Sequence, residues 1–423
     1  MRRSIIMSSW LVLSTFFAPL AFAAPESLSE LSERVEKIEE KNKRLENEIG
    51  KQRETIDSLS PKTDALGRNN FPEEDEAPLL YDGESEGQDG GISTLKITGF
   101  WDFGFNATIG EDEHSKSFTT GELDLFLTAE ISEKVSFLTE MVFYPVAVQN
   151  RLVFEMQRVI LKYSFSDLVN LQIGRMHTAL GYWNHTFHHG TWLQTTVLRP
   201  EIYRFDEYDH GLLPVHSVGV EFFGTKAFRP LHLEYHLGVT NGRGKTTNTA
   251  DAIQNLRDDN DSKAFNFLLG LTPRLIEGLQ VGGSLYLDKI PADPTKPARV
   301  EPIDERITGA YAVYFRHQAE LLGEIFKIDH HDQTSGKDFD TLGFYLQGGY
   351  KTDEWTPYYR FDRVNVGEGD PYLTSKQIDI TKHTFGLRWD LFSWNALKME
   401  YGFARNPGDE RSQFINLNSS ATF

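Results

Sequence analysis

The sequence lacks cysteine entirely and, after its first two dozen residues, has no apolar run as long as 18 residues. The first absence excludes disulfide frameworks, iron–sulfur clusters, thiol nucleophiles and thiolate zinc sites. The second excludes membrane-spanning helices, because such a helix needs about 20 apolar residues to cross a bilayer. A formal net charge of -19 also argues against nucleic acid as a partner.

Enzyme signatures are missing as well. Neither the zinc-protease pattern HExxH nor the nucleophile pattern GxSxG occurs in the chain. Neither type of hydrolytic site therefore has a basis in the sequence. We expect no enzymatic activity and no cofactor.

Aromatic residues are abundant, at 13% of the chain, and there are 34 glycines. From Thr94 onward, apolar and polar residues alternate in long segments, as in the run from Leu95 to Ile109. Alternation also occurs in soluble sandwiches. Segments of about 9 to 11 residues, however, match tilted strands that cross a bilayer, whereas soluble strands average about 5 to 6.

The number and spacing of these segments indicate a closed barrel. We count sixteen, starting near residues 95, 121, 135, 153, 169, 216, 230, 263, 279, 306, 319, 341, 355, 380, 396 and 412. Short connections alternate with long polar ones, which is typical of outer-membrane proteins. Residues 94–423 are therefore predicted to form an all-β, transmembrane antiparallel β-barrel of about 16 strands.

The N-terminus is organised like a secretory signal peptide. Met1, Arg2 and Arg3 form a basic start, a short apolar stretch follows, and Ala21-Phe22-Ala23 is a cleavage signal. Residues 1–23 are predicted to be removed on export. The alternative, an uncleaved anchor helix, needs a longer apolar stretch than the one present.

Residues 24–60 are predicted to form a short α-helical coiled coil. Eight of the ten heptad core positions are apolar: Leu28, Leu31, Val35, Ile38, Leu45, Ile49, Ile56 and Leu59. This narrow apolar stripe can be buried only against copies of itself or a partner helix. Asn42, at a core position, would fix the register of the helices. A lone surface helix is the alternative interpretation.

Residues 61–93 are predicted to be an acidic flexible linker. Between Phe71 and Gly91 there are eight acidic residues and no lysine or arginine, so mutual repulsion extends the segment. Loose calcium binding is the alternative to a solvated spacer.

Together these features resemble a Gram-negative outer-membrane porin. The coiled coil, Gly174-Arg175 before a long loop, and the stretch Pro357–Asp362 resemble more narrowly the phosphate-selective porin O/P-type family. The resemblance implies an outer-membrane barrel with its N-terminal segment in the periplasm, a homotrimer, and small anions as solutes. It also implies that the loop between the fifth and sixth strands folds into the barrel and narrows it.

Seven basic residues are the candidates for the pore and its constriction: Arg158, Lys162, Arg175, Arg199, Arg204, Arg360 and Arg388. Strand parity also predicts an inward position for Arg306. Arginine suits this role because its planar fork matches a carboxylate or a phosphate. The competing interpretation for the loop arginines is that they pair with neighbouring acids and pin the loop to the wall.

The loop from His177 to Val215 is rich in aromatic residues, so we expect it to pack against other parts of the protein. Six histidines lie at or beside it: His177, His185, His188, His189, His210 and His216. His185, His188 and His189 have the spacing of one helical turn and are the candidate metal ligands. The interpretation we favour is that the histidines supply hydrogen bonds within a packed loop.

These observations predict a porin through which small hydrophilic solutes or ions diffuse passively past a charged constriction. Two alternatives remain: an envelope tether acting through the coiled coil, and a substrate-specific uptake barrel of the siderophore type. The expected partners are outer-membrane lipid, the solutes, two further copies of the chain, and a periplasmic or cell-wall partner bound through residues 28–59.

The apolar stripe generates a first prediction. Deleting residues 28–59 should leave a folded barrel whose oligomer dissociates at lower detergent concentration than the intact protein, as measured by native electrophoresis. A synthetic peptide of residues 28–59 should associate into helical oligomers in analytical ultracentrifugation and circular dichroism. A peptide that stays monomeric and unfolded at high concentration would contradict the coiled coil.

Overall fold

The computed structural model describes residue 43 and residues 94–423, with gaps at 111–113, 147–149, 189, 205–210, 246–257, 374–378 and 406–410. The predicted signal peptide (1–23), coiled coil (24–60) and linker (61–93) lie outside the described residues, apart from Lys43. Among the described residues, no helix is long and apolar enough to cross a membrane.

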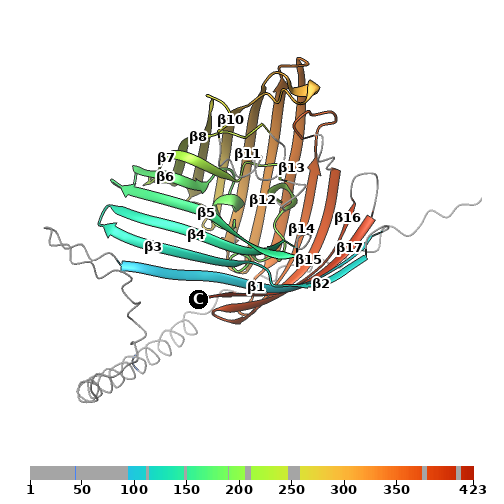
Figure 1. Ribbon diagram of the computed structural model, residues 1–423. Helices are drawn as coiled ribbons and strands as arrows, with labels where there is room; N and C mark the ends of the chain where they lie inside the picture. The colour runs from blue at the N-terminus through green and yellow to red at the C-terminus, as the bar shows by residue number, and fades with distance from the viewer. Residues whose placement is uncertain are drawn as a thin grey trace, which may run out of the picture. The chain divides into compact units, whose positions relative to one another are not determined.

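Antiparallel strands make up almost all of the described chain (Figure 1). They are β1 (Thr94–Gly110), β2 (His114–Thr119), β3 (Leu123–Ser132), β4 (Val135–Val146), β5 (Arg151–Ser164), β6 (Asn170–His177), β7 (His216–Ala227), β8 (Leu231–Asn241), β9 (Lys263–Pro273), β10 (Leu279–Ile290), β11 (Ile303–Arg316), β12 (Ala319–Asp332), β13 (Lys337–Tyr350), β14 (Trp355–Asn365), β15 (Asp379–Phe392), β16 (Asn395–Arg405) and β17 (Arg411–Thr422). Three short helices interrupt them: α2 (Trp183–Thr186), η2 (Glu201–Tyr203) and η3 (Pro297–Arg299).

β2 and β3 are two halves of one barrel strand. β2 pairs with residues 104–109 of β1, and β3 pairs with residues 94–101 of the same strand. Between the halves, Gly121 has a φ of 64°, and a Cβ there would lie 2.2 Å from Asp102 Oδ2. Because position 121 has no side chain, Asp102 can approach the backbone there, and its Oδ1 accepts a hydrogen bond from the Glu122 amide at 2.9 Å. The barrel therefore has 16 strands, which confirms the predicted fold, and only the break within the second strand was not anticipated.

The first and last strands close the barrel. β1 pairs with β17 from Phe100 opposite Thr422 to Gly110 opposite Ser412. Phe423 continues this pairing by exchanging two backbone hydrogen bonds with Gly99, of 3.0 and 3.1 Å. A Cβ at position 99 would lie 2.6 Å from the Phe423 ring, so the ring lies over the one residue type that leaves room for it. Closure removes every strand edge from the membrane region.

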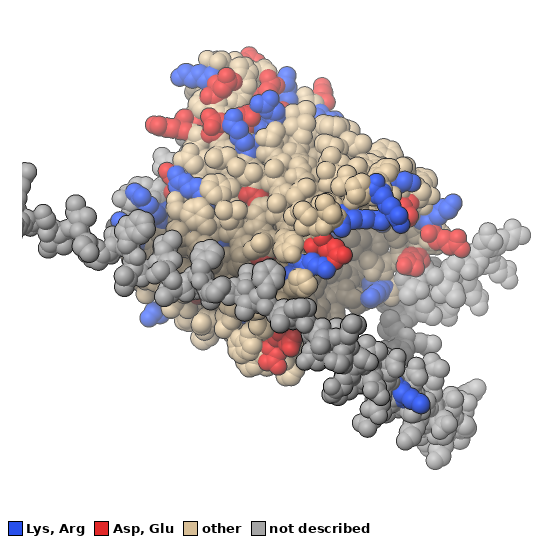
Figure 2. Space-filling model, turned by 180° about the vertical axis from the view of Figure 1, so that it is seen from behind, with Lys and Arg blue, Asp and Glu red and all other residues tan. Residues whose placement is uncertain are grey.

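The outer face of the barrel is apolar. On β13 the outward side chains Leu342, Phe344 and Leu346 follow one another, and large apolar side chains are exposed on most other strands. Figure 2 shows a broad surface with few charges, with most charged side chains at the top of the view and along its sides. Such a band matches the hydrocarbon layer of a bilayer.

The wall that includes β11, β12 and β13 extends beyond this band, since each of these strands has 14 residues whereas β6 has 8. One sequence prediction fails here. Arg306 faces outward and donates to Asp329 Oδ2 at 3.0 Å, because β11 begins at Ile303 and its buried residues are Glu305 and Ile307.

The outer face generates a second prediction. Replacing Leu346 with Arg places a charge in the apolar band and should lower the unfolding free energy in lipid vesicles by about 2–4 kcal/mol. The matched control is Asp340→Arg, on the same outward face of β13 but beyond the band, which should change it by about 0–1 kcal/mol. Equal losses in denaturant titrations of the two variants would place the membrane elsewhere.

Candidate functional site

The inward loop, residues 178–215, joins β6 to β7, and its described residues pack inside the barrel. Apolar loop residues form one buried cluster with the inner faces of the wall strands: Leu180, Trp183, Ile202, Tyr203, Leu212, Leu213 and Val215 pack against Tyr286, Ile307, Tyr311, Leu322, Phe326, Ile328 and Tyr345, among others. Gly343 makes room for this contact, because a Cβ there would lie 2.3 Å from Ile202 Cδ1. The expectation that the loop packs against the protein is confirmed.

Acidic wall residues accept hydrogen bonds from the backbone of the loop. Glu324 on β12 accepts from the amides of Tyr182 and Trp183 at 2.7 and 2.8 Å. Glu400 on β16 accepts from the amide of Val197 at 2.8 Å. Asp362 on β14 accepts in the same way from the amide of Glu201, at 3.0 Å.

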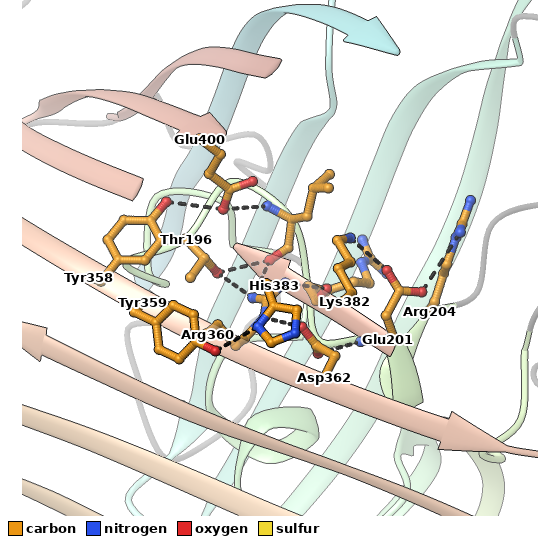
Figure 3. A network of polar contacts seen from close by, with 12 residues as sticks. Thr196, Glu201, Arg204, Tyr358, Tyr359, Arg360, Asp362, Lys382, His383 and Glu400 are labelled. Carbon is orange, nitrogen blue, oxygen red and sulfur yellow. Dashed lines mark hydrogen bonds and ion pairs between the residues drawn. The ribbon is translucent and has the colours of Figure 1, made fainter. Parts of the chain in front are cut away.

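Basic wall residues donate hydrogen bonds to the carbonyl groups of the loop. The Arg360 guanidinium donates to the carbonyls of Leu198 and Arg199 at 2.7 and 3.0 Å (Figure 3). Arg388 donates to the carbonyls of Trp192 and Gln194 at 2.8 and 2.9 Å. Lys398 on β16 contacts three loop carbonyls, those of Thr191, Gln194 and Thr196. An irregular segment is thus buried with its backbone polar groups paired.

A buried ion pair fixes the second half of the loop. Lys382 on β15 donates to Glu201 Oε1 at 2.6 Å, and Arg204 Nη1 lies 3.7 Å from Glu201 Oε2 (Figure 3). Burial alone would raise the pKa of Glu201, but the charges of Lys382 and Arg204 outweigh it and lower the pKa to about 2. These interactions stabilise the loop fully at pH values above 4.5, the ordinary pKa of a glutamate. The stabilisation is lost as the pH falls towards 2 and Glu201 becomes protonated.

An open cavity of about 800 Å³ lies between the loop and the wall formed by β1, β2 and β15–β17. Its charged lining comprises four basic residues, Arg199, Arg204, Lys382 and Arg411, and three acidic residues, Asp102, Glu122 and Glu201. Residues of the loop form its other wall, among them Trp183, His188, Thr191 and Leu198. The cavity is therefore mildly basic at its surface, although the whole chain is strongly acidic.

Two of the predicted pore residues, Arg199 and Arg204, line this cavity. Arg199 Nη2 lies 3.6 Å from Glu122 Oε1, which also lines the cavity, and the guanidinium carbon of Arg199 is 5.8 Å from the centre of the Trp183 ring. Arg204 is 37% exposed despite its contact with Glu201. Both arginines therefore pair with acids, as the competing interpretation proposed, while remaining at the cavity surface.

The strand residues among the predicted set lie elsewhere. Arg360 is fully buried and Arg388 is mostly buried, and both are bound to the loop backbone. Arg158 pairs with Glu140, and Lys162 lies 5.1 Å from the centre of the Phe223 ring. Arg175 is also buried, so neither it nor Arg360 offers a charge to the cavity surface.

The Gly174-Arg175 pair has a structural explanation. Gln157 is an extra residue between the β4–β5 pairs Glu140–Arg158 and Met141–Met156. Its carbonyl accepts a hydrogen bond from Arg175 Nε at 2.7 Å. Gly174 has a φ of 132°, and a Cβ there would lie 1.9 Å from the Val159 carbonyl oxygen. The glycine lets β5 and β6 approach, and the arginine pairs the bulged carbonyl.

The predicted histidine set is only partly assembled. Helix α2 ends at Thr186, so His185 and His188 do not share a helical turn. His185 is exposed and contacts His236, whereas His188 is buried beside His177 and His216. His189 and His210 lie outside the described residues.

A further buried network, which sequence analysis missed, holds the end of the loop. Arg243 donates to the Leu212 carbonyl at 2.6 Å and to Glu305 Oε2 at 2.9 Å. His330 bridges Glu305 to Asp370 with distances of 3.0 and 2.7 Å. Arg243 lies just after β8, in a polar stretch of sequence that predicts a loop. The alternating strand pattern does not extend to it, so the sequence does not predict that it is buried.

Comparisons with known proteins identify the fold. Three solved structures resemble this barrel: the anion-selective porin from Comamonas acidovorans (12% identity, 78% of this chain and 100% of that chain, TM-score 0.56), Salmonella typhi OmpF in complex with daunomycin (10%, 78% and 98%, 0.55), and the outer membrane channel DcaP of Acinetobacter baumannii (11%, 78% and 97%, 0.54). No family model matches the sequence, and no curated protein matches it. The chain has the 16-stranded barrel fold of outer-membrane porins.

The wall contacts generate a third prediction. Replacing Arg360 with Met removes three hydrogen bonds to the loop and leaves the carboxylate of Asp362 buried without the arginine that pairs with it, a change that typically costs about 3–5 kcal/mol. Peptides covering residues 190–204 should exchange amide hydrogen about 100-fold faster or more in hydrogen–deuterium exchange. Arg363→Met, three residues along β14 and paired with Asp379, should leave them unchanged.

Proposed function

We propose that the protein is an outer-membrane porin through which small hydrophilic solutes diffuse passively, with a weak preference for small anions. The observation that carries the proposal is the open, charged cavity between the inward loop and the barrel wall. A barrel filled by its own side chains would need no such space, and a barrel with an apolar lining would not admit hydrated ions.

The anion preference rests on the charges that reach the cavity surface. Four basic and three acidic residues line it, so its formal charge is positive by one. Arg204 contributes most directly, since more than a third of its side chain is exposed. Because Lys382 and Arg204 face one carboxylate, Glu201, they leave a local excess of positive charge. This supports small anions in general, without singling out phosphate.

The location and assembly follow from the same proposal. The apolar outer band supports an outer-membrane barrel, with the segment before β1 in the periplasm. A homotrimer is proposed from the heptad pattern of residues 28–59, which also suits a periplasmic or cell-wall partner. A tether with no open pore is the competing function. A siderophore-type transporter is disfavoured, because the barrel has 16 strands and such transporters have about 22.

Planar-bilayer conductance tests the proposal and supplies a fourth prediction. The purified protein should open ion channels whose reversal potential in a salt gradient shows a weak anion preference. The double variant Arg199→Ala, Arg204→Ala should shift this preference towards cations. At about 8 Å in water, each charge changes the energy of a monovalent ion by about 0.5 kcal/mol, so the permeability to anions should fall about fivefold and that to cations should rise by a similar factor.

Arg363→Ala is the matched control, since this arginine is on β14 and pairs with Asp379 away from the cavity lining. It should leave the reversal potential unchanged. Absence of conductance from a correctly folded barrel would favour the tether. A normal pore whose selectivity ignores the double variant would place the selective charges outside this cavity.

A further inference from the structure

Three histidines meet where the inward loop leaves and rejoins the barrel wall. His177 ends β6, His216 begins β7, and the two are register partners. The His188 ring from the loop lies against both, with centroid distances of 4.0 Å to His177 and 4.5 Å to His216. One ring nitrogen from each of the three lies within 4.8 Å of the others. We propose that these three imidazoles form a binding site for a divalent transition-metal ion of the zinc class.

The hydrogen bonds around His188 indicate which of its two ring nitrogens carries the proton. The side-chain amide of Asn184 donates to the carbonyls of Thr178 and Val215 at 2.9 and 3.0 Å, which assigns its Nδ2 as the donor. Asn184 Oδ1 is therefore the atom that lies 2.6 Å from His188 Nδ1, so Nδ1 carries the proton. Neutral His188 then has its lone pair on Nε2, the arrangement of a metal-binding histidine whose other nitrogen is hydrogen-bonded.

A carboxylate stands beside the second ligand. Glu140 Oε2 lies 3.7 Å from His177 Nε2, and the same carboxylate pairs with Arg158. A small side-chain rotation would let this carboxylate accept a hydrogen bond from His177 Nε2–H when the other ring nitrogen binds an ion. Glu140 is not itself a ligand, and Arg158 balances its negative charge. The ligand set is therefore three neutral imidazoles.

The donor set determines the class of ion. Imidazole suits zinc, copper and nickel, whereas calcium and magnesium prefer oxygen ligands. Three histidines also leave one tetrahedral position for water or another ligand. Zinc–nitrogen bonds of about 2.0–2.1 Å require ring nitrogens about 3.3 Å apart, so the rings would draw together by small side-chain rotations.

The site is accessible and well placed to affect the loop. His216 is fully buried, and His188 is buried yet forms part of the cavity lining, so an ion can reach it from the cavity. A bound ion would join the loop to β6 and β7 at a point where the wall charges on β12–β16 do not reach. It would also add positive charge at the cavity wall.

A second histidine group is a weaker candidate. His185, Glu234 and His236 also bring one ligand atom each within 4.8 Å. Both ring nitrogens of His236 already face carboxylates, Glu221 at 2.9 Å and Glu234 at 3.2 Å. Binding an ion there would break one of these contacts.

Metal binding to the full-length, untagged protein in detergent tests the proposal directly and does not depend on channel activity. After equilibration with Co²⁺ and gel filtration, we expect one ion per chain by mass spectrometry and visible absorption typical of a tetrahedral site. Zn²⁺ should displace the Co²⁺ and abolish that absorption. His188→Gln and His216→Gln should each weaken binding by 100-fold or more, and Glu140→Gln by about 10- to 100-fold.

The controls are His185→Ala, in the other histidine group, and His331→Ala, on the outer face of β12, and both should bind Co²⁺ like the parent protein. Circular dichroism verifies the fold of each variant. Failure of the parent protein to bind one ion overturns the proposal whatever the variants do. So does retention of the ion by folded His188→Gln, while loss in His185→Ala alone would move the site to the second group.

Discussion

The interior of this barrel depends on one constraint: an irregular loop inside a closed sheet must find partners for its backbone polar groups. Each such group left buried without a partner costs about 1–3 kcal/mol. The loop has only two short helices in its described residues, so it cannot satisfy these groups itself. The wall does so instead, with carboxylates facing loop amides and with arginine and lysine facing loop carbonyls.

This division explains why charges of both signs lie on inward strand positions. A water-filled lumen alone would account for charged side chains on the inner face. It would not explain why the acidic ones accept hydrogen bonds from loop amides while the basic ones donate to loop carbonyls. Glu324 and Glu400 also accept hydrogen bonds from tyrosine hydroxyls, Tyr345 at 2.7 Å and Tyr358 at 3.0 Å, which complete their surroundings. Many of the inward charges therefore determine the position of the loop, and fewer remain at the surface of the cavity.

The sequence predicted the barrel well because strand periodicity is a local signal and the bilayer imposes long strands. Fifteen of the sixteen strands begin within four residues of their predicted starts, whereas the second begins with β2 at His114, seven residues before its predicted start near 121. Arg306 was assigned to the wrong face. Its strand begins at Ile303, three residues before the predicted start, and its neighbours Glu305 and Ile307 are the residues that face inward. The packing of the aromatic loop was also predictable, since its exposed apolar area would otherwise be large.

The arrangement of the site was less predictable, because it depends on contacts between residues far apart in the chain. Lys382, Lys398 and Arg411 have inward or terminal strand positions like many other residues, and nothing local distinguishes their partners. The histidines show the same limit. Spacing suggested His185 with His188, but the register of β6 with β7 brings His177 to His216 and the loop adds His188.

The cavity shows how a strongly acidic chain can present a mildly basic passage. The net charge of -19 sums over the whole sequence, including eight acids between Phe71 and Gly91 that precede the barrel. At physiological ionic strength, exposed charges more than about 8 Å apart are largely screened from one another. In the described residues, the charged side chains that line the cavity are four basic and three acidic ones. Arg199, Arg204 and Lys382 each contact an acidic residue of the lining, so its single excess positive charge depends on a few close contacts.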